Sequence, residues 1–217
     1  MIETRQPEKV EVNGWHFRIQ SPELRRSDQR VMLLLHGYQG NENVMWILTK
    51  PLPKDYLLIA PRAPIQHGDG QYIWHEIAPQ WPDVHTYQLL GDQLFTRVDQ
   101  WLDEHNIKTR KFDLMGFSQG AVLAYALAIL QPSRINRVAA LAGFIPKAWK
   151  DQMDVKPLEN IPFFIAHGTQ DDIIPIQKAH RAANWLEENG AQVTFCEAEI
   201  GHKLSANCFD GLGSFFD

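Results

Sequence analysis

The sequence contains only two cysteines, no extended hydrophobic run and no cluster of basic residues. Two cysteines are too few for a disulfide-rich scaffold, and without a Cys-x-x-Cys pair they form no zinc-site pattern. The longest apolar run, residues 121–130, is well short of the roughly 20 residues that a membrane-spanning helix needs. The formal net charge is −5 and no basic run is longer than Arg25-Arg26, which disfavours a general nucleic-acid-binding function.

Further expectations concern the cysteines and the first residues of the chain. Cys196 and Cys208 are 12 residues apart in the sequence, and a chain of 217 residues needs no disulfide to fold. We therefore expect two buried or partly buried thiols, with a disulfide between them as the alternative. Residues 1–10 carry four charged side chains and no apolar stretch, which is unlike a secretory signal. The sequence thus predicts a soluble, cytoplasmic protein.

The composition is that of an ordinary globular protein. Hydrophobic residues make up 44% of the chain and charged residues 22%, both close to globular averages. A length of 217 residues suits one large α/β domain. Because no internal repeat or low-complexity tract divides the sequence, we expect a single domain over residues 1–217.

Apolar runs typical of strands buried on both faces alternate with helical patterns along the chain. The runs occupy residues 31–35, 56–60, 112–117, 138–142, 161–166 and 193–196. Helical periodicity marks residues 87–102, 121–130 and 177–188. Two alternating segments flank Asn13-Gly14, as in a β-hairpin. The sequence therefore predicts an α/β fold: a mostly parallel central sheet, an N-terminal antiparallel hairpin and helices on both faces.

Two stretches fit neither the strand pattern nor the helix pattern. Residues 62–85 and 143–160 each follow a predicted strand, so both should lie at the carboxyl edge of the sheet, where open α/β sheets bind ligands. Their aromatic side chains are candidates for binding an acyl or aryl group, with a small hydrophobic core under each loop as the alternative. These candidates are Trp74, Trp81, Phe144 and Trp149.

Residues 116–120 read Gly-Phe-Ser-Gln-Gly and lie between a predicted buried strand and a predicted buried helix. This strand–turn–helix context is what the nucleophile elbow of a serine hydrolase requires, because the tight turn leaves no room for side chains two residues before and after the serine. The pattern predicts that Ser118 is a catalytic nucleophile, exposed above the sheet.

A nucleophilic serine needs a histidine base and a carboxylate that orients it. His202 follows the last predicted strand and is our candidate base, whereas His167 should be structural and His180 should lie on a helix surface. The carboxylate should follow the strand at 161–166, where Asp171 and Asp172 are adjacent. Spacing alone does not choose between these two aspartates.

Two backbone N–H groups should stabilise the oxyanion. One belongs to Gln119, directly after the nucleophile, and the other to Tyr38, within His-Gly-Tyr-Gln-Gly after the strand at 31–35. Because both contacts use backbone, Tyr38→Phe and Gln119→Ala should keep much of the activity. The sequence has no Gly-x-Gly-x-x-Gly, no Gly-Lys-Ser/Thr and no His-x-x-x-His pair on a helix, so we expect neither a nucleotide cofactor nor a metal.

Together these segments resemble the α/β-hydrolase superfamily and, within it, the phospholipase/carboxylesterase family that includes acyl-protein thioesterases. The resemblance rests on residues 35–42, 60–64, 116–121 and 167–175 and on Gly201-His202. It implies that the acid of the triad is Asp171 and that Ile173 lines an acyl pocket. It also implies an α/β-hydrolase fold, and the length leaves no room for a large cap domain.

The expected activity is cofactor-free hydrolysis of carboxylic esters with short to medium acyl chains, through an acyl-enzyme on Ser118. The substrate would be a small-molecule or lipid ester, with no nucleic-acid partner. A thioesterase or lysophospholipase acting on acylated protein or lipid is the first alternative. A serine peptidase and a non-catalytic binding protein on the same fold are weaker ones. The sequence leaves open whether the protein forms a homodimer.

Overall fold

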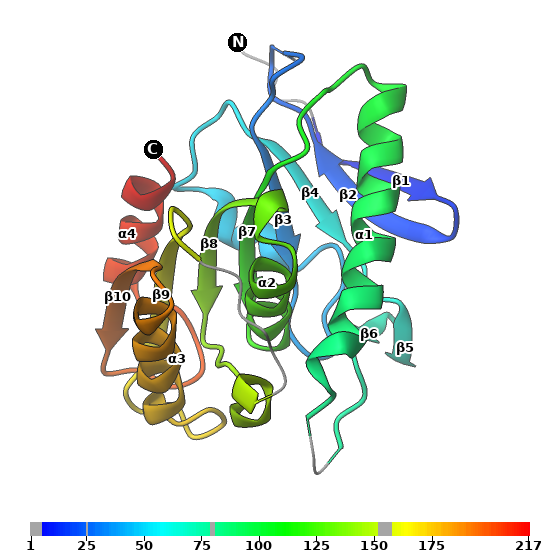
Figure 1. Cartoon of the computed structure of the whole chain (residues 1–217). Coiled ribbons are helices and arrows are strands. Elements are labelled where there is room, and N and C mark those ends of the chain that lie inside the picture. Colours follow the sequence, from blue (N-terminus) through cyan, green and yellow to red (C-terminus); the bar gives the residue numbers. More distant parts are fainter. Residues whose placement is uncertain (1–5, 25, 79–80, 152–157) are drawn as a thin grey trace.

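The computed structural model describes residues 6–24, 26–78, 81–151 and 158–217 (Figure 1). Its central sheet has eight strands in the order β1-β2-β4-β3-β7-β8-β9-β10. They are β1 (Glu8–Val12), β2 (Trp15–Gln20), β3 (Val31–Leu35), β4 (Leu57–Pro61), β7 (Phe112–Phe117), β8 (Ile135–Leu141), β9 (Pro162–Gly168) and β10 (Gln192–Ala198). The pairs β1/β2 and β2/β4 are antiparallel and the others are parallel, which confirms the predicted mostly parallel sheet with an N-terminal hairpin.

The hairpin turns at Asn13-Gly14, where both residues have positive φ (47° and 81°). Positive φ at both central residues defines a type I′ turn, whose twist matches that of the two paired strands. Asn-Gly is the preferred sequence for this turn. This local signal is why the hairpin could be predicted from sequence.

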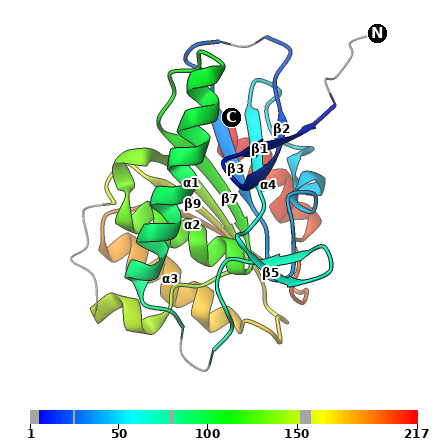
Figure 2. The same cartoon turned by 90° about the vertical axis from the view of Figure 1, so that its right-hand side faces the viewer.

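Helices cover both faces of the sheet (Figure 2). One face carries α1 (Val84–Glu104), α2 (Gln119–Leu130) and α3 (Ile176–Glu188), and the other carries α4 (Ala206–Phe216). Alternate residues of β3 serve the two faces: Leu33 and Leu35 belong to the core under α1–α3, whereas Met32 and Leu34 belong to the core under α4. A strand buried on both faces therefore reads as a continuous apolar run.

The observed strands differ from the predicted ones mainly at the ends. β8 begins at Ile135, three residues before the predicted run, because the polar Asn136 and Arg137 continue the strand beside β7. β10 is longer than predicted because it is an edge strand with alternating exposure. Within residues 62–85, which showed no strand pattern, the chain forms the two-stranded sheet of β5 (Ile65–Gly68) and β6 (Gln71–Ile73).

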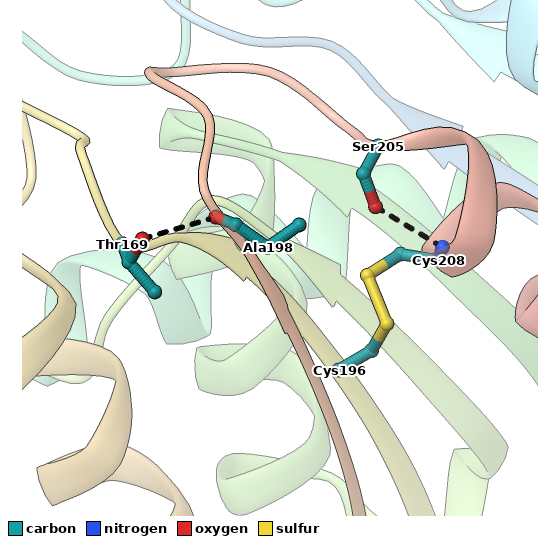
Figure 3. Close-up of a disulfide and its surroundings, with 5 residues drawn as sticks. All are labelled: Thr169, Cys196, Ala198, Ser205 and Cys208. Carbon is teal, nitrogen blue, oxygen red and sulfur yellow. Dashed lines mark hydrogen bonds between the residues drawn. A yellow bond between two sulfur atoms is a disulfide. The ribbon is translucent and has the colours of Figure 1, made fainter.

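The expectation of two free thiols is wrong. Cys196 near the end of β10 and Cys208 in the first turn of α4 form a disulfide (Figure 3). The sequence separation of 12 residues does not indicate that an edge strand and the following helix approach each other here.

Three short 3₁₀ segments are also present: η1 (Met45–Thr49), η2 (Pro132–Arg134) and η3 (Lys147–Asp151).

Candidate active site

Ser118 stands at the turn between β7 and α2 with φ 53° and ψ −115°, a conformation that non-glycine residues rarely adopt. The two flanking glycines explain how the turn is packed. A Cβ on Gly116 would lie 2.2 Å from the carbonyl oxygen of Gly120, and a Cβ on Gly120 would lie 2.1 Å from that of Leu35. Only glycine fits at either position, as the elbow pattern predicted.

His202 lies in the loop between β10 and α4, and its ring reaches both other members of the predicted triad. Its Nδ1 is 2.7 Å from Asp171 Oδ2, and its Nε2 is 2.9 Å from Ser118 Oγ. An ionised carboxylate can only accept a hydrogen bond, so Nδ1 carries the ring proton and its N–H donates a hydrogen bond to Asp171. Nε2 is then free to accept the hydroxyl hydrogen of Ser118, which is the arrangement a general base needs.

Asp171 is held as an ionised acceptor. Its Oδ1 accepts the N–H groups of Ile173 (3.0 Å) and Ile174 (2.8 Å), while Oδ2 faces His202. Burial alone would raise the pKa of this carboxyl, but these N–H groups and the His202 ring together bring its pKa below the usual value. Asp172 is exposed, so the structure brings Asp171, and not its neighbour, to His202.

The two other histidines of this region lie apart from the Ser118 hydroxyl. His167 is buried, and its Nε2 donates to the carbonyl of Ile174 at 2.7 Å and lies 3.3 Å from Asp171 Oδ2. Burial lowers the pKa of His167, so the ring is a neutral donor beside the acid. His180 is on the surface of α3, 2.9 Å from Glu197.

The loop after β3 lies against the nucleophile. A Cβ on Gly37 would lie 3.4 Å from Ser118 Cβ, and the following residue, Tyr38, lines the same cavity as Ser118. Gln119 is the first residue of α2, and N–H groups in the first turn of a helix have no partner within the helix. Tyr38 and Gln119 thus belong to the two segments that adjoin Ser118, and their role as oxyanion donors stays a prediction.

An ion pair that the sequence analysis did not identify anchors this loop. Arg62, just after β4, donates from Nε and one terminal nitrogen to the two oxygens of Glu42, each at 2.7 Å. The Arg62 bond holds the pKa of the buried Glu42 at about 2. Bidentate pairs of this kind fix geometry as well as charge. The two residues are 20 positions apart, and no local pattern connects them.

Ser118 and His202 open onto a cavity of about 630 Å³, a usual size for a ligand site. Its wall is largely apolar. Ile173 is part of it and is 66% exposed, as the family resemblance implied. The sequence analysis missed the other apolar lining residues, which are Val44, Met45, Ile47, Leu48, Phe117 and Leu204.

The four aromatic candidates do not line this cavity. Trp74, Phe144 and Trp149 are buried in the core, with exposures of 3%, 5% and 0%, and Trp81 packs against Phe144 with 4.8 Å between ring centroids. The indole N–H groups of Trp74 and Trp149 are used by backbone carbonyls. The alternative interpretation, a hydrophobic core under the loops, describes them correctly.

A larger cavity of about 840 Å³ lies beside β9, β10 and α4, but none of the residues around Ser118 lines it. In the part of the chain that the structure describes, no three His, Cys, Asp or Glu side chains are grouped so as to hold a metal ion. None of the helices within the described residues is both long and apolar enough to cross a membrane.

Comparison with known proteins gives a consistent family. The phospholipase/carboxylesterase family model matches residues 15–217. Acyl-protein thioesterase 1 of Emericella nidulans is 24% identical over 212 residues, covering 86% of this chain and 88% of that protein. Esterase YpfH of Escherichia coli is 25% identical, covering 87% and 82%.

Among solved structures, the Bacillus cereus carboxylesterase superimposes with a TM-score of 0.81 at 21% identity, covering 93% of this chain and 92% of that chain. This likeness confirms the α/β-hydrolase fold, and the match of the family model extends over nearly the whole sequence. The chain therefore belongs to the phospholipase/carboxylesterase family and is a hydrolase.

Proposed function

We propose that the protein hydrolyses carboxylic esters of short to medium acyl chains, with Ser118 as nucleophile, His202 as base and Asp171 as the acid that orients the base. One observation carries the proposal: Ser118 Oγ lies 2.9 Å from a histidine nitrogen whose ring is bonded to a carboxylate. The same serine opens onto an apolar cavity. Nucleophile, base and orienting group are thus in hydrogen-bond contact beside a place for the substrate.

In the first half of the reaction, Oγ attacks the ester carbonyl while Nε2 of His202 takes the hydroxyl proton. The backbone N–H groups of Tyr38 and Gln119 stabilise the oxyanion that forms. When the tetrahedral intermediate collapses, the C–O bond to the leaving alcohol breaks and the alcohol takes the proton from His202. Water then attacks the acyl-enzyme by the same steps, which releases the carboxylic acid and restores Ser118.

The cavity supports an acyl group as the recognised part of the substrate. Ile47 and Ile173 are 71% and 66% exposed, and both lie on its wall. When a hydrocarbon chain covers exposed apolar side chains around the serine, apolar surface is removed from water, which favours binding. The cavity is open to solvent, so we expect the hydrolysis rate to change gradually with the length of the acyl chain.

A thioester is the second candidate substrate. The observation that favours it is the relatedness to acyl-protein thioesterase 1 of Emericella nidulans. The same serine, histidine and oxyanion donors would cleave a thioester, because only the leaving group changes from an alcohol to a thiol.

A matched substrate series tests both candidates. Hydrolysis of p-nitrophenyl esters with acyl chains from acetate to palmitate is measured beside acyl thioesters of the same chain lengths, with wild type and Ser118→Ala. We expect the highest kcat/KM for short to medium oxygen esters and a loss of at least about 10³-fold in Ser118→Ala. Turnover that survives this substitution would refute the mechanism, and a general preference for thioesters would favour the second candidate.

A further inference from the structure

Trp74 lies in the buried segment at the end of the β5–β6 hairpin. The hairpin itself is joined to the loop after β3, because the N–H of Tyr72 donates to the carbonyl of Gly40 at 2.9 Å. The chain enters the interior at Ile73, the last residue of β6, and Trp74 and His75 continue the buried segment with exposures of 3% and 5%. Neither Trp74 nor His75 is among the residues that line the cavity at Ser118.

The side chain of Gln119 holds the segment from the other side. Its Oε1 accepts the backbone N–H of Trp74 at 2.9 Å, and its Nε2 donates to the carbonyl of His75 at 2.9 Å. Gln119 is 4% exposed, so each of these backbone groups would be buried without a partner if the amide were removed. Gln119, whose backbone N–H is a proposed oxyanion donor, therefore also binds the backbone of residues 74–75 through its side chain.

Trp74 completes the connection to the loop after β3. Its indole N–H donates to the carbonyl of His36 at 2.7 Å, and the two rings lie 4.9 Å apart. His36 comes two residues before Tyr38, the other proposed oxyanion donor. One buried residue therefore contacts both segments that supply these N–H groups: residues 36–38 through its ring and Gln119 through its backbone.

We propose that Trp74 and the Gln119 side chain form a bracket, defined here as these two residues and their three hydrogen bonds, that fixes the spacing between the two oxyanion donors. They are positioning residues, and the inference rests on the proposed function of Ser118. Oxyanion donors act because they are held in place before the charge develops. A displacement of about 1 Å in an active site can cost about 10²-fold in rate. The bracket also changes the expectation for Gln119→Ala, which should lose more activity than a purely backbone role predicts.

Trp74→Phe is the sharpest test, because it keeps a buried ring and deletes one N–H. Trp149→Phe is the matched control: it deletes another buried indole N–H that donates to a backbone carbonyl, that of Pro82 at 2.9 Å. Both variants should lose stability, but only Trp74→Phe should lose about tenfold in kcat, with KM within about twofold of wild type. Gln119→Met, which keeps the side-chain length, should give the same kinetic change. The double variant should lose less than the product of the two single losses, because both residues act through one bracket.

A trifluoromethyl ketone supplies a readout that structural damage alone would not move. Ser118 Oγ adds to its carbonyl carbon and gives its proton to Nε2 of His202, and the oxyanion that results is stabilised by the two N–H groups. In Trp74→Phe and Gln119→Met, the inhibition constant should rise by the same factor by which kcat/KM falls. In Trp149→Phe it should stay at the wild-type value.

The outcomes separate the two levels of the argument. Wild-type kcat and inhibitor affinity in Trp74→Phe, beside an inactive Ser118→Ala, would overturn the bracket and leave the proposed function standing. If Trp74→Phe does not fold, the same two measurements on Gln119→Met decide. Absence of Ser118-dependent turnover in the wild-type enzyme would overturn the proposed function and the bracket together.

Discussion

The disulfide closes the loop that carries His202, and its removal should have separable effects on stability and on rate. Cys196 and Cys208 flank residues 197–207 (Figure 3). The perturbation is Cys196→Ser together with Cys208→Ser, which keeps the side-chain size at both positions. A cross-link over 12 residues removes chain entropy from the unfolded state worth about 3 kcal/mol. For a protein of this size, that loss lowers Tm by roughly 6–12 °C.

The effect on kcat should be smaller, because other contacts hold the first half of the loop. The N–H of Thr169 donates to the carbonyl of Ala198 at 2.8 Å, and the N–H of Gln170 donates to that of Ile200 at 3.0 Å. His202 keeps its own bond to Asp171. We therefore expect kcat to fall by less than about tenfold.

Denaturant unfolding monitored by circular dichroism measures the stability loss, and ester hydrolysis measures kcat. The chain has only two cysteines, so titration of thiols in the unfolded protein reports directly whether the bond is present: none before reduction and two after it. Ser205→Ala is the control, because it removes the side-chain acceptor for the N–H of Cys208 and leaves the cross-link intact. That change should lower the free energy of unfolding by about 1 kcal/mol. If the free energy of unfolding of the double serine variant lies within about 0.5 kcal/mol of the wild-type value, the reasoning is refuted.

Three further predictions concern single side chains. Asp171→Asn should lower kcat by about 10²–10⁴-fold and the exposed Asp172→Asn far less; equal losses in steady-state assays would contradict the assignment of the acid. Ile173→Ser should raise KM for octanoyl esters several-fold more than for acetyl esters, and a uniform change would place the acyl chain elsewhere. Burial lowers the pKa of His36 from 6.5 to about 4, so between these pH values the unfolded chain binds a proton that the folded chain does not. The free energy of unfolding should therefore fall by about 3 kcal/mol as pH drops from 6.5 to 4, and His36→Gln should flatten this dependence in denaturant titrations.

The features that could be predicted from the sequence are those with a local physical signature. Residues of β3 and β7 are buried on both faces and read as apolar runs. The turn at Ser118 needs glycine two residues before the serine for a local reason, because a Cβ on Gly116 would meet the backbone of Gly120. The need for glycine at position 120 comes from the strand next to it, since a Cβ there would meet the carbonyl of Leu35. The candidate base and the loop that carries the acid followed from chain order, since both come from loops at the carboxyl ends of strands. The choice of Asp171 over Asp172 came from the family resemblance.

The features that could not be predicted depend on partners far apart in the chain. The indole of Trp74 donates to a carbonyl 38 residues earlier, and Arg62 pairs with a carboxylate 20 residues earlier. An aromatic residue in an irregular stretch gives no sign of whether its N–H faces a substrate or a buried carbonyl. The same holds for Ile47, whose place on the cavity wall depends on how η1 folds over the edge of the sheet.

These non-local contacts divide the support of Ser118 into two independent parts. On one side, Trp74 and the Gln119 side chain hold the backbone donors. On the other, the disulfide and the bonds of Asp171 hold His202. A substitution in the first part should weaken binding of a tetrahedral oxyanion, because it moves the donors and leaves the base in place. A substitution in the second part should slow proton transfer from Ser118 and leave that oxyanion site intact.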